Sequence, residues 1–450
     1  MAEPFDLIVI GTGAGGSAPA YQCKGKGWRV AVVDELPYGG TCALRGCDPK
    51  KVLVGAAELV DWNRRMQGRG VDRETRIAWP ALMGFKRTFT EPVPPDSEAG
   101  FQEAGIMTYH GPACFVRPDR LAVDGEVLEG RHFVVATGAK PRRLKIPGEE
   151  HIATTTDFLE LERLPDRIAF VGGGYISFEF AHVARRAGAQ ATILARSVAL
   201  RQFEQELVQR LVDHTRSLGV EVRLGTEVTG VEKNGDRYQL HVRAGGREDT
   251  VEADLVVHGA GRVPNTEDLG LQDANVATEK SGGVQVNEYL QNVTNPQVYA
   301  AGDVIGLPGK LPLTPVAGYE GTIVASNLMQ GNNRTPDYRG IPSVVFTAPP
   351  LASVGLTEAE AREQDLDVRV RTEDTSGWYS NRRVGEVCAK FKSIVERQSD
   401  RIVGMHLLGP DAAEVINLFA LAVRQGLTAR DLKQQLYAYP TSGSDVPYML

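Results

Sequence analysis

The stretch that decides the fold opens the chain and reads Phe5-Asp6-Leu7-Ile8-Val9-Ile10-Gly11-Thr12-Gly13-Ala14-Gly15-Gly16. An apolar run leads through a glycine loop into a helix of small residues, and a second apolar run, 30–33, ends in Asp34. This order predicts a βαβ unit whose glycines bring backbone N–H groups close to a pyrophosphate at a helix N-terminus. The predicted phosphate-binding glycines are Gly11, Gly13, Gly15 and Gly16. Asp34 is the predicted ribose partner, and Glu35 is the weaker alternative.

A second unit of the same kind starts at Arg167. The run 167–171 leads through Gly172-Gly173-Gly174 into a predicted helix over 175–186 and then into a strand over 191–194. Gly172 and Gly174 are its predicted phosphate-binding residues.

The second unit ends differently from the first. No acid follows its last strand, and Arg196 stands there instead, with Arg201 five residues later. A guanidinium binds a 2′-phosphate that a carboxylate would repel, so we expect these arginines to select NADPH, with NADH less favoured. The alternative is that both are solvated surface residues.

The order of these units predicts an α/β protein with two Rossmann-like dinucleotide-binding domains and a C-terminal α+β domain. In the C-terminal part, strand-like runs such as 402–408 alternate with helical stretches such as 412–425. We place the domains at 1–150, 151–265, 266–339 and 340–450, and 266–339 is expected to complete the first domain.

The composition excludes several classes of protein. Charged residues make up 24% and hydrophobic residues 42%, and no apolar run is long enough for a membrane span. A net charge of −7 without a dense basic block does not favour nucleic acid as a partner. The 8 histidines lack metal-ligand spacing, so no metal site is predicted. Five cysteines and no targeting segment at the N-terminus lead us to expect a cytoplasmic protein.

Two of the cysteines lie in the glycine-containing loop Gly39-Gly40-Thr41-Cys42-Ala43-Leu44-Arg45-Gly46-Cys47-Asp48-Pro49-Lys50. In a helical first turn, this spacing would bring the two sulfurs within bonding distance, and a helix N-terminus favours the reactive thiolate. A metal site would need two further ligands, and no other Cys or His is near in sequence. Cys23, Cys114 and Cys388 are predicted to be packing residues.

Together these motifs identify a family. The chain resembles the FAD-dependent class I pyridine nucleotide–disulfide oxidoreductases, the group of glutathione reductase, dihydrolipoamide dehydrogenase and mercuric reductase. The resemblance runs nearly from end to end. Besides both glycine loops and the cysteine loop, it rests on the segments 136–138, 261–265, 299–303, 313–317, 341–346 and 354–358.

The resemblance implies roles for individual residues. Cys47 would be the flavin-facing thiolate and Cys42 the thiol that attacks the substrate. Lys50 and Glu179 would form an ion pair near the flavin, and Tyr175 would cover the flavin until NADPH arrives, unless it only packs. The first glycine loop would hold FAD, Asp303 would bind its ribityl chain, and Arg262 would help hold NADPH. Further residues implied to contact the cofactors are Gly40, Thr41, Thr137, Gly138, Gly261, Gly302 and Thr314. A homodimer with active sites shared between subunits is also implied.

The chain departs from the family pattern at several positions. Tyr439 and Ser444 stand where the family usually has the His and Glu that serve as its acid–base pair. A phenol, with a pKa near ~10 against ~6.5 for an imidazole, donates a hydrogen bond but does not cycle a proton readily near neutrality. Asp445 is the alternative acid. Asp48 replaces an apolar residue and is expected to disfavour the neighbouring thiolate.

Three functions stay open at this point. The first is NADPH-dependent reduction of a small-molecule or protein disulfide, although efficient glutathione reduction is not expected. The second is reduction of a quinone or metal ion, which needs no proton for a leaving thiol. A dedicated mercuric reductase is not favoured, because the chain ends without a cysteine pair. The third is a redox-sensing flavoprotein with low turnover. The segment 378–382 is predicted to line either a substrate entrance or an interface.

Overall fold

The computed structural model describes residues 3–307 and 311–450. The chain forms two compact units, and each unit is assembled from separate stretches of sequence. The first unit contains Met1–Lys50, Gly84–Arg142 and Gly261–Asp337, and the second contains Lys51–Met83, Arg143–Ala260 and Tyr338–Leu450. Two helices, α3 (Cys47–Met66) and α4 (Trp79–Thr90), continue along the chain from one unit into the other. The domain boundaries near 150, 265 and 340 stay predictions.

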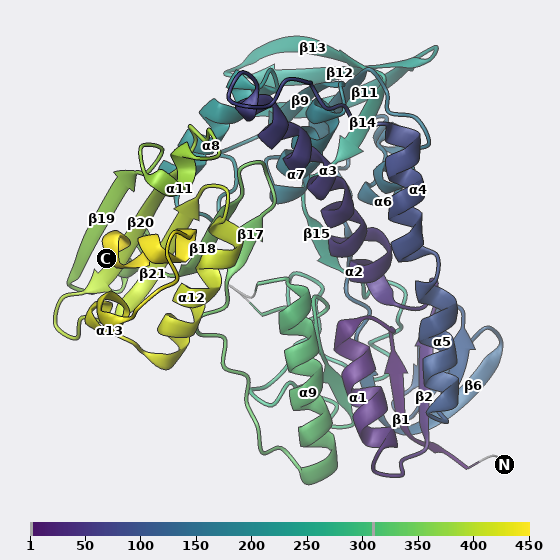
Figure 1. The fold of residues 1–450 in the computed structure, drawn as a ribbon. Helices are drawn as coiled ribbons and strands as arrows, with labels where there is room; N and C mark the ends of the chain where they lie inside the picture. The colour runs from purple at the N-terminus through teal and green to yellow at the C-terminus, as the bar shows by residue number, and fades with distance from the viewer. Residues whose placement is uncertain (1–2, 308–310) are drawn as a thin grey trace. The chain divides into compact units, whose positions relative to one another are not determined.

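A seven-stranded sheet forms the centre of the first unit (Figure 1). Its strands are β1 (Phe5–Ile10), β2 (Val30–Asp34), β3 (Met107–His110), β4 (Ala113–Arg117), β5 (Arg120–Val123), β6 (Glu126–Val135) and β16 (Val298–Ala300). The strands β3, β2, β1, β6 and β16 pair in parallel, while β4 and β5 join β6 in antiparallel pairs. Leu7 on β1 lies between Val30 and His132 and is fully buried. A nearly continuous apolar run such as 7–10 is typical of a parallel strand buried on both faces.

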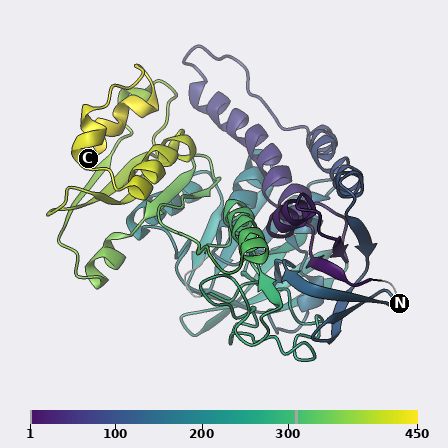
Figure 2. The ribbon, with the colours of Figure 1, turned by 90° about the horizontal axis from the view of Figure 1, so that it is seen from below.

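Helices cover this sheet and approach one another closely. Both views show α1 (Ala14–Lys24) beside α9 (Thr314–Gln330) (Figures 1 and 2). A Cβ atom at Gly321 of α9 would lie 2.6 Å from the carbonyl oxygen of Gly15, so only glycine permits this contact. The remaining elements of this unit are α2 (Gly40–Arg45), α5 (Val93–Glu103) and the antiparallel pair β7 (Ala139–Pro141) and β15 (Arg262–Pro264).

The second unit contains three sheets (Figure 1). The parallel sheet has the order β10 (Glu221–Leu224), β9 (Gln190–Ala195), β8 (Arg167–Val171), β14 (Leu255–His258), and α7 (Tyr175–Arg186) packs on β8 and β9. A small antiparallel sheet follows with β11 (Thr226–Asn234), β12 (Arg237–Ala244) and β13 (Arg247–Ala253). The third sheet has the order β17 (Ser343–Val345), β18 (Leu351–Gly355), β21 (Ile402–Leu408), β20 (Lys390–Glu396), β19 (Val368–Asp374).

Helices complete the second unit, and α12 packs on β18 and β21. They are α6 (Thr155–Leu159), α8 (Gln205–Ser217), α10 (Glu358–Glu363), α11 (Tyr379–Arg382), α12 (Ala412–Gln425) and α13 (Ala429–Gln434), with two 3₁₀ helices, η1 (Glu149–His151) and η2 (Ser442–Met449). The predicted α/β class with a C-terminal α+β region is confirmed. Within the described ranges, none of the helices combines the length and the apolar character that crossing a bilayer requires.

Candidate active site

The glycine loop after β1 forms a tight cradle. Gly11 has a φ of 105°, and a Cβ atom there would lie 2.4 Å from the carbonyl oxygen of Ala136. A Cβ atom at Gly16 would lie 2.0 Å from the carbonyl oxygen of Gly11. Gly13 precedes α1, and in the described part of the chain no side chain caps this helix. The first-turn N–H groups of α1 therefore suit the pyrophosphate of a dinucleotide such as FAD.

Asp34 closes this cradle at the end of β2. One carboxylate oxygen accepts hydrogen bonds from the Thr12 backbone N–H at 2.9 Å and from the Thr12 hydroxyl at 2.6 Å. The other oxygen accepts from the Leu36 N–H at 3.0 Å. These bonds hold the carboxylate at the rim of the glycine loop, where its remaining lone pairs suit ribose hydroxyls.

The cysteine loop lies against the same cradle. Gly40, the first residue of α2, has a φ of 73°, and a Cβ atom there would lie 2.5 Å from the Gly13 Cα. The two cysteines lie close together, as predicted, but they do not share one helical turn: Cys42 lies in α2 and Cys47 is the first residue of α3. The reason is Gly46, whose φ of −138° and ψ of −119° end α2. Both thiols are free in this structure.

The pKa values of the two thiols are shifted in opposite directions. A hydrogen bond from Cys42 lowers the pKa of Cys47 to about 6, helped by the Lys50 charge and the Thr314 hydroxyl and opposed by burial and the Asp48 charge. The same hydrogen bond and burial raise the pKa of Cys42. In the reduced pair, negative charge is therefore favoured on Cys47 over Cys42. The Cys42 Sγ also lies 3.8 Å from the Asp48 Oδ1.

Several residues that were predicted to bind the cofactors lie close together in another part of the first unit. The Thr137 hydroxyl donates to the carbonyl oxygen of Asn265 at 2.7 Å, and the Asn265 N–H donates to the carbonyl oxygen of Gly138 at 3.0 Å. Arg262, which follows Gly261, donates to the carbonyl oxygen of Ala139. The pairing of β7 with β15 thus gathers the 137–139 and 261–265 segments.

The segment before Asp303 depends on a carboxylate that the sequence did not single out. Gly302 follows β16 with a φ of 83°, and its N–H donates to the Glu320 Oε2 at 2.8 Å. Glu320 lies on α9 and is fully buried. The only sequence signal was a single charged residue in an otherwise uncharged helix.

In the second unit, the glycine loop after β8 repeats the features of the first. A Cβ atom at Gly172 would lie 2.3 Å from the carbonyl oxygen of Gly259, and Gly174 precedes α7. Arg196 follows β9 with 81% of its side chain exposed and lies 4.0 Å from the Glu227 carboxylate. The Arg201 guanidinium donates to the Ser197 hydroxyl at 3.1 Å.

The other predicted catalytic residues of the second unit lie on α7 and near the C-terminus. Tyr175 opens α7 and is 37% exposed, whereas Glu179 is fully buried and its Oε1 accepts from the Phe346 N–H at 2.8 Å. Tyr439 is 81% exposed. Asp445 accepts a hydrogen bond from the Ser380 hydroxyl, and burial raises the pKa of Asp445.

Comparisons with known proteins agree with this site. Residues 5–321 match the family model of pyridine nucleotide-disulphide oxidoreductases, and 341–449 match the dimerisation domain of the same family. The chain is 34% identical to a glutathione reductase of Burkholderia cepacia, covering 97% of this chain and 96% of that protein. It is 33% identical to a mercuric reductase of Staphylococcus aureus, covering 97% and 80%.

A solved structure is similar over the whole chain. It is the Cu(II) complex of the HOCl-induced flavoprotein disulfide reductase RclA from Escherichia coli, with a TM-score of 0.89, 26% identity, and coverage of 100% of this chain and 99% of that one. A dinucleotide cradle beside two free thiols of opposite acidity is the site of an FAD-dependent NAD(P)H oxidoreductase with a redox-active disulfide. The chain belongs to the class I pyridine nucleotide–disulfide oxidoreductase family.

Proposed function

We propose that this protein uses NADPH to reduce a small-molecule or protein disulfide through Cys42 and Cys47. The observation that carries the proposal is the hydrogen-bonded contact of Cys42 with Cys47 in the loop whose Gly40 lies against Gly13 of the dinucleotide cradle. A thiolate at Cys47 beside a protonated Cys42 is the state from which a dithiol can hand two electrons to an acceptor.

The first glycine loop, Asp34, Gly40, Thr41 and Asp303 would hold FAD. Support comes from Gly11 and Gly16, where a Cβ atom would collide with backbone carbonyl oxygens, and from the uncapped start of α1 within the described chain. When bound, FAD supplies two-electron transfer between a nicotinamide and the cysteine pair.

The cysteines act in a fixed order in this proposal. Cys42 first passes its proton to the Cys47 thiolate along their hydrogen bond. The Cys42 thiolate then attacks one sulfur of the substrate disulfide, forms a mixed disulfide and displaces the first substrate thiolate, which takes the proton from Cys47. The Cys47 thiolate then attacks the Cys42 sulfur, which releases the second substrate thiol and closes the Cys42–Cys47 disulfide. Two electrons leave the protein, and the proton of Cys42 goes to one of the released thiols.

Three further side chains prepare this chemistry. Lys50 stabilises the Cys47 thiolate by its charge, in keeping with its effect on the pKa of that thiol. We assign Glu179 to an ion pair with Lys50 and Tyr175 to covering the nicotinamide site. The start of α7 after Gly174 supports the assignment of Tyr175.

NADPH, rather than NADH, is the proposed electron donor. Arg196 and Arg201 would bind the 2′-phosphate, and Arg262 would help hold the cofactor. The exposed Arg196 guanidinium, at the end of β9 where an NAD site carries an acid, supports this preference.

A second candidate function rests on Tyr439. The dimerisation-domain match supports a homodimer, and we propose that Tyr439 acts in a site shared between subunits. A phenol there donates a hydrogen bond but is a poor proton shuttle for a leaving thiol. Quinones and metal ions need no such proton, so their reduction is the alternative.

The test is an acceptor panel of disulfides, quinones and metal ions, assayed with the wild type and a Cys42→Ser variant. Disulfide reduction that disappears in the variant is the expected result. A quinone or metal-ion activity that exceeds disulfide reduction and survives in the variant would favour the alternative function.

A further inference from the structure

A polar stripe runs along α7 in the second unit. Glu179, His182 and Arg186 stand at the spacing i, i+3, i+7, which places them on one face of the helix. All three are buried, with exposed fractions of 0%, 1% and 3%. Burying a polar side chain is costly unless it is hydrogen-bonded, so we expect these three residues to have hydrogen-bond partners.

The stripe binds the main chain of residues 346–348. The Phe346 N–H donates to the Glu179 Oε1 at 2.8 Å, and the Ala348 N–H donates to the His182 Nδ1 at 3.1 Å. The Arg186 Nη2 donates to the carbonyl oxygen of Ala348 at 2.8 Å. One helix face thus holds three main-chain groups of a short segment.

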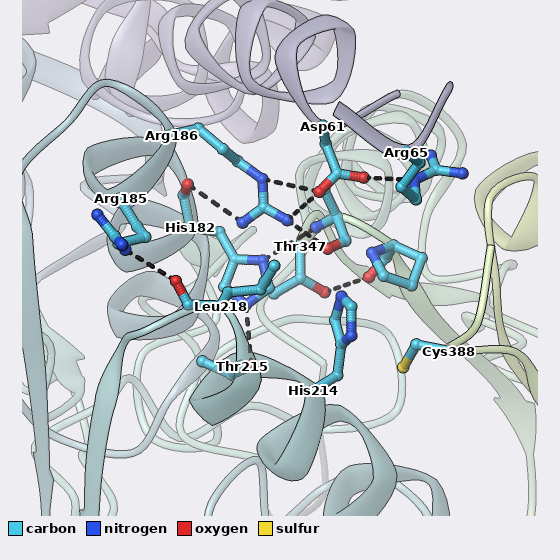
Figure 3. Close-up of polar contacts among 12 residues, drawn as sticks. Asp61, Arg65, His182, Arg185, Arg186, His214, Thr215, Leu218, Thr347 and Cys388 are labelled. Carbon is cyan, nitrogen blue, oxygen red and sulfur yellow. Dashed lines mark hydrogen bonds and ion pairs between the residues drawn. The ribbon is translucent and has the colours of Figure 1, made fainter. Parts of the chain in front are cut away.

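The hydrogen bonds of His182 run in one direction, from the Ala348 N–H to the ring and from the ring to Thr215. Burial holds the pKa of His182 well below its usual value, so the ring is neutral. Because Nδ1 accepts the Ala348 N–H, the proton lies on Nε2, which is 2.9 Å from the Thr215 hydroxyl oxygen and donates to it. The Thr215 hydroxyl in turn donates to the carbonyl oxygen of Leu211 at 2.7 Å. The chain of bonds fixes the ring against α8 (Figure 3).

Arg186 is held in place by an ion pair with Asp61. Its Nη2 lies 2.5 Å from the Oδ1 of Asp61 on α3, and the Asp61 Oδ2 accepts from the Arg65 Nε at 2.9 Å (Figure 3). This pair lies within the second unit and is shielded from solvent, so salt screens it little.

We propose that His182 and Arg186 are positioning residues that hold the 346–348 segment where the Phe346 N–H orients the Glu179 carboxylate. The functional part of this inference rests on the proposed function, in which Glu179 forms an ion pair with Lys50 near the flavin. Neither His182 nor Arg186 was singled out by the sequence motifs. They act through the Phe346 backbone, whose N–H donates to the carboxylate.

The experiment uses the holoenzyme with four variants: His182→Leu, His182→Asn, Glu179→Gln and the double variant His182→Leu/Glu179→Gln. Asparagine keeps an acceptor in place of Nδ1, whereas leucine removes it and retains the apolar volume. A matched control is His406→Leu, because His406 is equally buried and is bound to Ser353 and Leu356 rather than to the 346–348 segment. Hydrogen exchange at the Phe346 and Ala348 amides and the rate of flavin reduction by NADPH are measured.

We expect His182→Leu to speed exchange at both amides and to slow flavin reduction about tenfold, with His182→Asn near the wild type. In the Glu179→Gln background, His182→Leu should add no further slowing, because both substitutions act through one carboxylate. The control variant should alter neither measurement.

Unchanged exchange at Phe346 in His182→Leu would overturn the inference, and so would a slowing that persists undiminished in the double variant. A Glu179→Gln variant that reduces its flavin at the wild-type rate would instead refute the role of Glu179 in the proposed function. Faster exchange at Phe346 in His182→Leu would in that case still establish the structural link.

Discussion

The Cys47 Sγ lies 3.8 Å from the Thr314 Oγ1, although 267 residues separate the two in sequence. Cys47 is the first residue of α3 and Thr314 is the first residue of α9. The hydroxyl lowers the pKa of both cysteines. The start of a helix that lies far along the chain thus helps to lower the pKa of Cys47.

Thr314→Val should raise the pKa of Cys47 above about 6. The hydroxyl stabilises the charged form, so its loss favours the thiol, and a change of about one pH unit is expected. The check is the pH dependence of Cys47 alkylation in the reduced protein. Thr322→Val is the control, because Thr322 on the same helix donates only to the carbonyl oxygen of Gly318. An unchanged midpoint in Thr314→Val would contradict the assigned contact.

Asp48→Asn should shift the same midpoint in the opposite direction. The Asp48 charge raises the pKa of both cysteines, so its removal should extend the thiolate of Cys47 to lower pH. The group is exposed, and we expect roughly half a pH unit. Asp96→Asn, at the first turn of α5, is the matched control. A midpoint that rises in Asp48→Asn would mean that the carboxylate assists the thiolate.

Arg196→Glu should lower kcat/KM for NADPH about 10- to 100-fold and leave that for NADH unchanged or higher. If Arg196 binds the 2′-phosphate as proposed, the substitution would replace a charge-assisted bond with repulsion. Steady-state kinetics with both cofactors provide the measurement. Arg247→Glu makes the same charge change at an exposed position on β13 and should not alter the preference. Equal losses for both cofactors in Arg196→Glu would refute the assignment to the 2′-phosphate.

Tyr439→His should raise glutathione-disulfide reduction at least tenfold at neutral pH. An imidazole can carry the proton that a phenol releases poorly, and general acid–base catalysis typically contributes about 10²–10⁴ in rate. The assay is NADPH oxidation with glutathione disulfide, compared with Tyr439→Phe. No gain in Tyr439→His would show that the acceptor pocket, rather than the missing acid, limits this reaction.

The dinucleotide loops and their strands were predictable because their signals are local. Apolar runs followed by glycines predicted β1 and β8, and the helix expected at 175–186 matches α7. Gly11 and Gly172 adopt positive φ values at the turns where the motif requires a residue without a side chain. Each of these signals can be read from a short stretch of sequence, although the contacts that make the glycines necessary, with Ala136 and Gly259, come from distant residues.

The contacts that tune the site were not predictable in the same way. Asp61 and Arg186 are 125 residues apart, and only the packing of α3 against α7 joins them. In the sequence, His182 and Arg186 look like the polar face of an amphipathic helix. What distinguishes them from such a face is that their side of the helix is buried, and this burial is known only from the fold. The break between α2 and α3 depends on the conformation of Gly46, which the cysteine spacing alone did not predict.

The most direct test of electron transfer through Cys47 is an anaerobic titration of the oxidised holoenzyme with NADPH, following long-wavelength charge-transfer absorbance between a thiolate and the flavin. We predict that the band grows in the wild type on addition of NADPH, is present without reductant in Cys42→Ser, and is absent throughout in Cys47→Ser. A wild type that bleaches without the band, or a band that persists in Cys47→Ser, would contradict the account.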